Sequence, residues 1–402
     1  MTRVVLGVSG GIAAYKAAEL LRRLTESGHD VTVVPTDSAL QFVGAPTWAA
    51  LSGKPVTTSV WDEVHQVPHV RIGQTADLVV VAPATADLLA KAAAGLADDL
   101  LTNTLLTARC PVVFAPAMHT EMWEHAATQA NVATLRERGC VVIEPAVGRL
   151  TGADSGKGRL PDPDEIFAIC IRLLARGLTA DLAGRRVVIS AGGTREHLDP
   201  VRFLGNRSSG KQGYALARTA AARGAEVVLV AANSALPDPA GVKVVRVTSA
   251  LELRDAVIAE ALSADVVVMS AAVADYRPAE RLTTKRKKTE TLNVDLVQNP
   301  DVLAELGAAR RDGQVLVGFA AETGDADGSV LDHGRAKLAR KGCDLLVVNE
   351  VGETGHPTGF EGDSNAAVVL GSDGSSTEIP LASKDQLADV VWDLVAARLP
   401  AS

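Results

Sequence analysis

The stretch "RVVLGVSGGIAAYKAAELLRRL", residues 3–24, holds a β-branched run, a glycine turn and an Ala/Leu-rich helical pattern in that order. The helical pattern continues over 13–28 and ends on Gly28, a common helix terminator. The same alternation runs through the first half of the chain, with strands expected at 3–8, 30–34, 77–83, 111–116 and 140–145. Uniformly apolar strands separated by helices predict a parallel sheet covered by helices on both faces.

The alternation restarts after a helix at about 163–176 and a polar segment at 176–186, which we interpret as a linker. Strands are then expected at 185–190, 225–231, 242–247, 264–271, 314–320 and 343–349, with a hairpin over 365–381. The polar, basic stretch 277–298 has no clear periodicity and is expected to be a mobile loop. The sequence therefore predicts an α/β protein with two domains, 1–178 and 179–402, and no internal repeat.

Composition narrows the class of protein. A chain of 402 residues is too long for one ordinary core, and its net charge of −8 argues against a general nucleic-acid or membrane binder. The four cysteines lie far apart without a C-x-x-C pair, so neither a disulfide framework nor a zinc site is expected. No signal peptide is recognisable and no apolar run reaches the ~18 residues needed to span a bilayer. A cytoplasmic protein is therefore expected.

The first glycine turn is a candidate phosphate site. Gly10 and Gly11 let a ligand approach the backbone, the following helix can hold a phosphate at its N-terminus, and Ser9 adds a hydroxyl. The turn lacks the G-x-G-x-x-G pattern, and Thr36 and Ser38 follow the second strand where a dinucleotide site would have an acidic residue. A mononucleotide is therefore favoured over NAD, with a plain strand–helix turn as the alternative.

Three further stretches carry a resemblance: "HVRIG" at 69–73, "ADLVVVAPATADLLAKAAAGLADDLL" at 76–101 and "FAPAMHTEMW" at 114–123. Together they resemble the flavin-dependent cysteine decarboxylase family over about residues 1–175. The resemblance implies a flavodoxin-like flavoprotein domain, a site built by a trimer and His69 as the base that takes a thiol proton. It also implies FMN bound by Ser9, Gly10, Gly11, Ser38, Phe42, Thr85, Ala86 and Met118.

The sequence departs from this family's pattern twice. His119 stands where the family has the Asn that holds the substrate carboxylate, and a histidine can still donate a hydrogen bond there. In the lid segment "GRLTGADSGKGRL", 148–160, Gly152 takes the place of a cysteine that acts in the last reduction step, which leaves Asp154 as the acidic member. Asp154, a group from a neighbouring subunit or water is expected to supply the proton.

"GNRSSGKQG", 205–213, nearly matches the P-loop pattern G-x-x-x-x-G-K-[ST], but Gln212 replaces the residue that holds magnesium. About 14 residues also separate it from the preceding strand, whereas a P-loop follows its strand directly. We therefore expect a loop-to-helix turn that faces an anion, with no role assigned to Lys211.

Other stretches of the second half form a further resemblance: "SAAVADYRPAERLTTKRKK" (270–288), "VQNPDVL" (297–303), "GFAAETGD" (318–325) and "GRAKLARKGCDLLVVN" (334–349). With the 190–232 region they resemble phosphopantothenate–cysteine ligase over nearly all of 183–395. The K-R-K-K run taken alone would be a solvated loop. The resemblance implies a Rossmann-like ligase domain that uses CTP, with Mg²⁺ at Asp275, Asn206 on the acyl-cytidylate and Lys285 as the catalytic cation. The CTP-binding residues it implies are Ala271, Ala274, Asp275, Lys285, Asn299, Pro300, Asp301, Val302, Phe319, Lys337 and Lys341.

The two halves stand in the order found in the bifunctional coenzyme A biosynthesis family. That resemblance implies CTP-dependent ligation of cysteine to 4′-phosphopantothenate through an acyl-cytidylate, then FMN-dependent decarboxylation to 4′-phosphopantetheine. Trimeric flavin halves and dimeric ligase halves would together give a dodecamer. The alternatives are a prenyl-flavin synthase, a peptidyl-cysteine decarboxylase, a flavin- and nucleotide-binding sensor, and a ligase whose decarboxylase half is impaired by the lid substitution.

Overall fold

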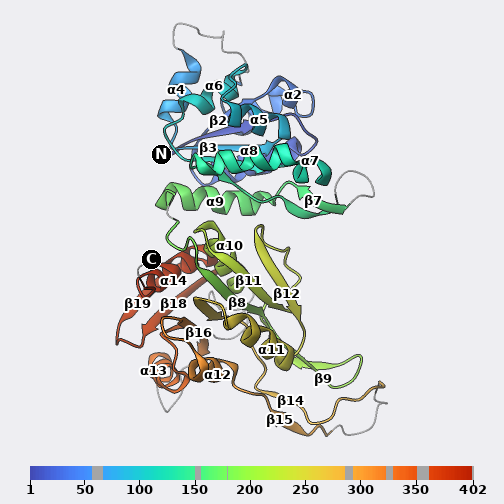
Figure 1. Ribbon diagram of the computed structural model, residues 1–402, viewed down its shortest axis with the longest axis vertical. Helices are drawn as coiled ribbons and strands as arrows, with labels where there is room; N and C mark the ends of the chain where they lie inside the picture. The colour runs from blue at the N-terminus through green and yellow to red at the C-terminus, as the bar shows by residue number, and fades with distance from the viewer. Residues whose placement is uncertain are drawn as a thin grey trace. The chain divides into compact units, whose positions relative to one another are not determined.

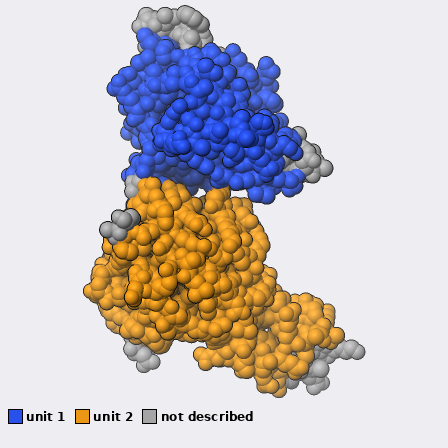
Figure 2. All heavy atoms as spheres, in the orientation of Figure 1, with its two compact units in different colours: residues 1–179 blue, residues 180–402 orange. Residues whose placement is uncertain are grey.

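The computed structural model describes residues 1–56, 67–149, 155–178, 180–285, 293–322, 329–350 and 362–400. Several residues singled out above lie outside the described residues: Gly152, Asp154, Arg286, Lys287 and Lys288. The chain divides into two compact units, Met1–Thr179 and Ala180–Ser402, which are coloured separately in Figure 2. No helix in the described residues is long and apolar enough to cross a membrane.

The first unit contains a parallel five-stranded sheet (Figure 1). Its strands are β1 (Arg3–Val8), β2 (Asp30–Pro35), β3 (Leu78–Ala84), β4 (Val112–Pro116) and β5 (Val141–Val142). They stand in the order β2-β1-β3-β4-β5, so the chain reverses direction across the sheet between β1 and β3. In doubly wound folds this reversal is the switch point where ligands bind, beyond the carboxyl ends of the strands.

Every residue of β3 is buried, because helices cover both faces of this sheet. The helices are α1 (Ala14–Glu26), α2 (Asp37–Leu40), α3 (Ala45–Ser52), α4 (Pro68–Thr75), α5 (Ala86–Ala94), α6 (Leu100–Thr107), α7 (Thr120–Glu124), α8 (Ala126–Glu137) and α9 (Pro163–Arg176). Side chains of α5, α6 and α8 form one core cluster with the strands. A separate antiparallel hairpin, β6 (Ala146–Arg149) with β7 (Ser155–Arg159), spans the expected lid segment.

The second unit is built on an eight-stranded sheet in the order β12-β11-β8-β13-β16-β17-β18-β19. Its strands are β8 (Arg186–Gly192), β11 (Glu226–Ala232), β12 (Val242–Val247), β13 (Val266–Met269), β16 (Val315–Glu322), β17 (Leu345–Glu350), β18 (Ser364–Gly371) and β19 (Ser376–Ser383). The first six in spatial order run parallel, and β18 and β19 are antiparallel. The strand order reverses between β8 and β13, which places a second switch point there.

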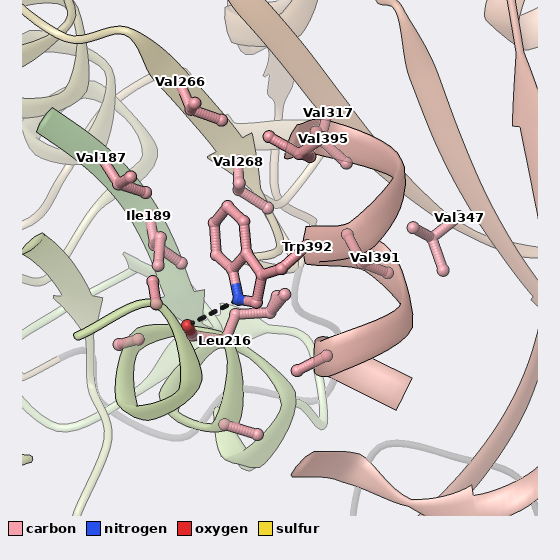
Figure 3. Packing of buried hydrophobic residues seen from close by; sticks show 14 of the residues in the cluster. Val187, Ile189, Leu216, Val266, Val268, Val317, Val347, Val391, Trp392 and Val395 are labelled. Atoms are coloured by element: carbon pink, nitrogen blue, oxygen red, sulfur yellow. Dashed lines mark hydrogen bonds between the residues drawn. The ribbon is translucent and has the colours of Figure 1, made fainter. Parts of the chain in front are cut away.

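Two helical layers enclose this second sheet. Its helices are α10 (Lys211–Ala222), α11 (Ala250–Ala261), α12 (Val302–Ala309), α13 (Val330–Lys341) and α14 (Lys384–Ala396). Because neighbouring residues of a strand point to opposite faces, Val187 and Ile189 pack toward α10 and α14 while Val188 packs toward α11. Trp392 of α14 is fully buried in the core between the sheet and helices α10 and α14. Its indole nitrogen donates to Leu216 O at 3.1 Å (Figure 3).

Four short strands form an arm beside the sheet of the second unit. β9 (Arg195–His197) pairs with β10 (Phe203–Gly205), and β14 (Tyr276–Pro278) pairs with β15 (Leu296–Gln298), all antiparallel. The Leu282 N–H donates to Leu198 O at 3.0 Å, so the two hairpins are joined (Figure 1). We call β9, β10, β14 and β15 the arm.

The α/β fold class with two doubly wound sheets is confirmed. The expected strands at 3–8 and 242–247 and the helix at 163–176 match the structure to the residue. The prediction of a loop over 277–298 is wrong at both ends, where β14 and β15 pair with each other. These strands are three residues long, too short for an apolar period to identify. The strand expected at 140–145 is shorter in the structure, where β5 covers only Val141–Val142.

Replacing Trp392 with alanine should lower the free energy of unfolding of the second unit by about 3–5 kcal/mol, because it empties a fully buried indole site. Denaturant unfolding followed by circular dichroism measures this change. The transition of the first unit, whose core cluster does not contain Trp392, should keep its wild-type midpoint. A loss below about 1 kcal/mol would contradict the packing described for α10 and α14.

Candidate active sites

A buried serine joins the two turns at the switch point of the first unit. Ser9, only 2% exposed, follows β1 and donates its hydroxyl hydrogen to Pro83 O at 2.7 Å. The same hydroxyl oxygen accepts from the Thr85 N–H at 2.9 Å. Since its hydrogen is already used, Ser9 can only accept from a ligand. These two hydrogen bonds hold the turn after β1 against the turn after β3.

Close backbone approach follows at Gly10. A Cβ atom at Gly10 would lie 2.3 Å from the Cβ of Ser38, so only glycine lets the turn after β1 approach α2 this closely. Helix α1 starts without a side-chain cap. The N–H groups of Ala14 and Lys16 donate to the carbonyls of Gly11 and Ala13, so only the other N–H groups of this turn could meet an anion. The structure thus brings together Ser9, Gly10, Ser38 and Thr85, and we call this group with Gly11 and Ala86 the cradle.

Large apolar side chains are exposed close to the cradle in sequence. Ile12, Tyr15 and Phe42 are 62%, 60% and 51% exposed, respectively. Ile12 and Tyr15 follow the glycine turn, and Phe42 follows α2. Phe42 is one of the residues expected to bind FMN.

The hairpin β6–β7 is docked on the motif that contains Met118 and His119. The Met118 N–H donates to Gly158 O at 2.9 Å, and a Cβ at Gly156 would lie 2.3 Å from Thr120 Oγ1. Lys157 pairs with Glu144 at 2.6 Å, and its ammonium lies 5.9 Å from the centre of the Trp123 ring. His119 itself is exposed and precedes α7 without capping it, so its ring is free to meet a ligand.

His69 lies in the first turn of α4, and its contact is with α6. The Thr107 hydroxyl donates to His69 O at 2.8 Å. Its Nδ1 is buried without a hydrogen-bond partner in the described part of the chain. None of the hydrogen bonds between described residues joins His69 to the cradle, so the two are not shown to meet within one chain.

At the second switch point, the turn Ala271–Asp275 after β13 lies against the turn after β8. The Ala271 N–H donates to Ser190 Oγ at 3.1 Å and the Ala274 N–H donates to Thr194 Oγ1 at 2.9 Å. Gly192, with φ +85°, approaches Ala232 O so closely that a Cβ would lie 2.0 Å from it. Ser190 and Thr194 were not predicted from the sequence, although both flank the "SAGGT" glycines.

Asn206 and Asn299 reach the same turn from two other segments. Asn206 Nδ2 donates to Val273 O at 3.2 Å, and Asn299 Nδ2 donates to Ala274 O at 2.8 Å. Asp275, by contrast, is exposed. Gly210 gives helix α10 no side-chain cap. The Lys211 N–H donates to Ser209 Oγ at 3.5 Å, and the N–H groups of the next residues of the turn could meet an anion at this switch point.

The lysines expected to bind the triphosphate are paired with carboxylates. Lys337 contacts Glu322 at 2.6 Å, and Lys341 pairs with Asp301. Partial burial alone would raise the pKa of the Asp301 carboxyl. The hydrogen bonds from Lys341 and from the Ala304 N–H outweigh this effect, so the pKa of Asp301 is lowered. The two pairs link α13 to β16 and to the start of α12.

The remaining predicted residues of the second unit differ in exposure. Val302 is buried in the core beneath the sheet, so only its backbone is available to a nucleotide. Phe319 is partly buried against the core cluster of α10 and α14, and Pro300 is partly exposed. Lys285 is exposed at the last described position before the gap in the basic stretch.

Lys211, to which the sequence assigned no role, pairs with Asp363 at 2.6 Å. Its neighbour Gln212 donates from Nε2 to Lys384 O at 3.2 Å, which connects the starts of α10 and α14. Lys384 is buried, and this burial, together with the Lys211 charge, lowers the pKa of Lys384 to about 8 despite the opposing effect of Asp363. The hairpin β9–β10 separates β8 from α10, whereas a P-loop follows its strand directly. Geometry as well as sequence therefore excludes the P-loop interpretation.

Comparison with known proteins identifies the family. Residues 1–175 match the family model described as Flavoprotein, and residues 182–399 match the DNA/pantothenate metabolism flavoprotein C-terminal domain. The chain is 62% identical over 407 residues to the coenzyme A biosynthesis bifunctional protein CoaBC of Mycolicibacterium smegmatis, covering 99% of this chain and 98% of that protein. The chain belongs to the CoaBC family.

Solved structures resemble each half of this CoaBC family member. The C-terminal domain of a coenzyme A biosynthesis bifunctional protein CoaBC is 36% identical and covers 54% of this chain and 97% of its own, with a TM-score of 0.46. The FMN-dependent cysteine decarboxylase SpaF is also 36% identical and covers 39% of this chain and 90% of its own, with a TM-score of 0.35.

Membership of the CoaBC family confirms the recognition made from the sequence motifs. It also confirms the expected bifunctional enzyme, a flavoprotein decarboxylase joined to a ligase, and does not favour a sensor. The roles of individual site residues stay predictions.

The depressed pKa of Lys384 predicts how the stability of the second unit depends on pH. An unfolded lysine keeps its proton up to about pH 10.5, whereas the folded residue releases it near pH 8. The unfolded state therefore binds more protons between these values, and the free energy of unfolding should rise with pH by on the order of 1–2 kcal/mol from pH 8 to 9.5. Urea unfolding at the two pH values measures it. Burial raises the pKa of Cys343 in the same unit to about 11, which opposes this rise in wild type and in Lys384→Met alike, so the contribution of Lys384 is the difference between the two pH dependences. A Lys384→Met chain with the pH dependence of the wild type would refute the assignment.

Proposed function

We propose that this chain makes 4′-phosphopantetheine from 4′-phosphopantothenate and cysteine in two reactions, one at each switch point. The main support is the same arrangement in both units. Each switch point has turns fixed by buried hydroxyl groups beside the N-terminus of a helix without a side-chain cap. Such a helix end suits an anionic phosphate, and both reactions involve phosphorylated ligands.

In the ligase unit, a carboxylate oxygen of 4′-phosphopantothenate would attack the α-phosphorus of CTP. The bond to the bridging oxygen breaks, pyrophosphate leaves, and an acyl-cytidylate forms. The amine of cysteine then attacks the acyl carbon, loses a proton and displaces CMP to give the amide. Asn206 beside the 271–275 turn would hold the acyl-cytidylate, and Lys285 would stabilise the charge that develops on the leaving pyrophosphate.

The triphosphate would be bound by α13, where Lys337 and Lys341 would exchange their carboxylate partners for phosphate oxygens. The described residues contain no group of three or more His, Cys, Asp or Glu that could hold a metal ion. A Mg²⁺ ion at Asp275 would therefore take most of its ligands from the nucleotide and water, as Mg²⁺ usually does in nucleotide sites.

In the flavoprotein unit, the cradle fits a flavin mononucleotide. The Gly10 turn leaves no room for a side chain, and the first turn of α1 can meet the phosphate. Bound FMN would supply a two-electron acceptor that converts the thiol of the acylcysteine to a thioaldehyde, which stabilises the carbanion left by loss of CO₂. His69, with Nδ1 free among the described residues, would take the thiol proton. His119 would donate a hydrogen bond to the substrate carboxylate.

The last step, addition of a hydride and a proton to the enethiol, would take its hydride from the two electrons that bound flavin holds. Its proton would come from Asp154, a group of a neighbouring subunit or water in place of the family's lid cysteine. Cysteines elsewhere in the described chain do not replace it. Burial raises the pKa of Cys170 to about 12 and also raises that of Cys140, so neither is a ready proton donor or thiolate.

We further propose that the flavin site is completed by a second copy of the chain. The backbone of His69 is bonded to α6, and no hydrogen bond between described residues joins it to the cradle. Exposed Ile12, Tyr15 and Phe42 lie close to the cradle in sequence. The arm of the ligase unit also carries exposed apolar side chains, namely Val201, Phe203, Leu204, Tyr276, Leu296 and Val297. Trimers through the flavin unit and dimers through the arm would give a dodecamer.

Incubation of the purified chain with 4′-phosphopantothenate, cysteine, CTP and Mg²⁺ tests the whole proposal. Yellow protein that releases pyrophosphate and then CO₂ is the expected result. Pyrophosphate without CO₂ would mean that the flavin unit does not decarboxylate the product of the ligase unit. Absence of pyrophosphate would reject the ligase assignment.

Lys285→Gln should lower the ligation rate at least about 100-fold, because one charged group offsetting the leaving pyrophosphate is lost. Bound flavin and decarboxylation of supplied phosphopantothenoylcysteine should stay at the wild-type level. Lys243→Gln is the matched control, since Lys243 is an exposed lysine of β12 that pairs with Glu260 at 2.8 Å. Wild-type ligation by Lys285→Gln would remove this lysine from the mechanism.

Mixed oligomers test the shared flavin site. Gly10→Ala should lose flavin and His69→Gln should lose the base, so neither variant alone should release CO₂. Unfolded and refolded together in equal amounts, they should regain about a quarter of the wild-type rate, because a quarter of the sites pair an intact cradle with an intact His69. The same two variants refolded separately and then combined are the matched control, and they should release no CO₂. No recovery in the first mixture would place the whole site within one chain.

A further inference from the structure

The backbone of the turn Ala271–Asp275 is held by hydrogen bonds from several separate segments. Its N–H groups donate to Ser190 Oγ, to Gly192 O at 2.8 Å and to Thr194 Oγ1. Its carbonyl groups accept from the Thr194 N–H at 3.2 Å, from Asn206 and from both the side chain and the main-chain N–H of Asn299. A turn held in this way keeps one conformation before any ligand arrives.

Thr194 grips this turn with both its main chain and its side chain. Its N–H donates to Ala272 O, and its hydroxyl oxygen accepts from the Ala274 N–H two residues further along. The side chain is completely buried, so it cannot itself contact a nucleotide in solution. Neighbouring Gly193 forms an isolated parallel bridge with Ala272, and a Cβ there would lie 2.9 Å from Asn206 O.

Asn299 also holds the 271–275 turn in place. Only 7% exposed, it donates from Nδ2 to Ala274 O, and its Oδ1 accepts from Arg277 at 3.1 Å. Both ends of its amide are therefore in use within the protein. The expectation that Asn299 also binds CTP stays a prediction.

We propose that Thr194, with Asn299, is a positioning residue of the ligase site: it fixes the 271–275 turn in the conformation that presents Asp275 and the free backbone groups of the turn to CTP. This inference rests on the proposed function of the ligase unit. Without the hydroxyl, the buried Ala274 N–H has no acceptor, and the turn spends part of its time displaced toward solvent. Binding of CTP must then draw the turn back, which weakens apparent affinity by the fraction of chains in the competent conformation.

The test is pyrophosphate release by the full-length flavin-loaded chain, with CTP varied and the other substrates saturating. Thr194→Val, which keeps the shape and loses the acceptor, should raise the KM for CTP about tenfold while kcat changes less than about twofold. Thr194→Ser restores the hydroxyl and should bring KM back to within about threefold of wild type. A purely structural role would instead lower the amount of active protein, which reduces apparent kcat and leaves KM unchanged.

Thr219→Val is the matched control, since Thr219 is also a buried threonine of this unit whose hydroxyl accepts from Trp392 Nε1 at 2.9 Å. It should lower thermal stability without changing KM. If Thr194→Val prevents the ligase unit from folding, Asn299→Ala must show the same rise in KM for CTP. An unchanged KM in the folded variant, or failure of serine to restore it, overturns the inference. A wild-type chain that releases no pyrophosphate overturns the proposed function instead.

Discussion

Both units depend on buried hydroxyl groups that join two turns across a switch point. Ser9 connects the turn after β1 to the turn after β3, and Ser190 and Thr194 connect the turn after β8 to the one after β13. Where strand order reverses, the chain leaves the sheet in opposite directions, so the last backbone groups have no strand partner. Side-chain hydroxyls satisfy these groups without filling the crevice. The same residues that complete the hydrogen bonding of the sheet therefore also shape the two ligand sites.

At the proposed ligase site, the charged pairs on α13 would allow the lysines to exchange their carboxylate partners for phosphate. Lys337 and Lys341 lie one turn apart on α13, and their mutual repulsion is offset by Glu322 and Asp301. Partly exposed pairs of this kind contribute about 0–1 kcal/mol each, far less than two lysines gain from a triphosphate held at close range. The carboxylates thus keep the lysines ordered without competing strongly with a nucleotide. A chain with a net charge of −8 can in this way hold a highly anionic substrate.

The sequence predicted what depends on local pattern. β1, β12 and α9 could be located to the residue because buried β-branched runs and a helix that begins at Pro163 and ends before Gly177 carry their own boundaries. Partners distant in sequence could not be predicted. Lys211 pairs with Asp363, 152 residues away, and Thr194 with Ala274, 80 residues away. The family resemblance supplied candidate site residues, but which of them face a ligand and which, like Asn299, hold other residues in place depends on these distant contacts.

The departures from the family pattern concern chemistry more than architecture. The lid hairpin is docked on the His119 motif by the Met118 N–H to Gly158 O bond, by the close approach of Gly156 and by Lys157. None of these contacts involves position 152. In the proposed mechanism, a glycine in place of the family's cysteine would remove a thiol that acts after CO₂ has left. Its loss would then affect the addition of a hydride and a proton to the enethiol and not the steps before it. CO₂ release should accordingly be less sensitive to the substitution than formation of the final thiol.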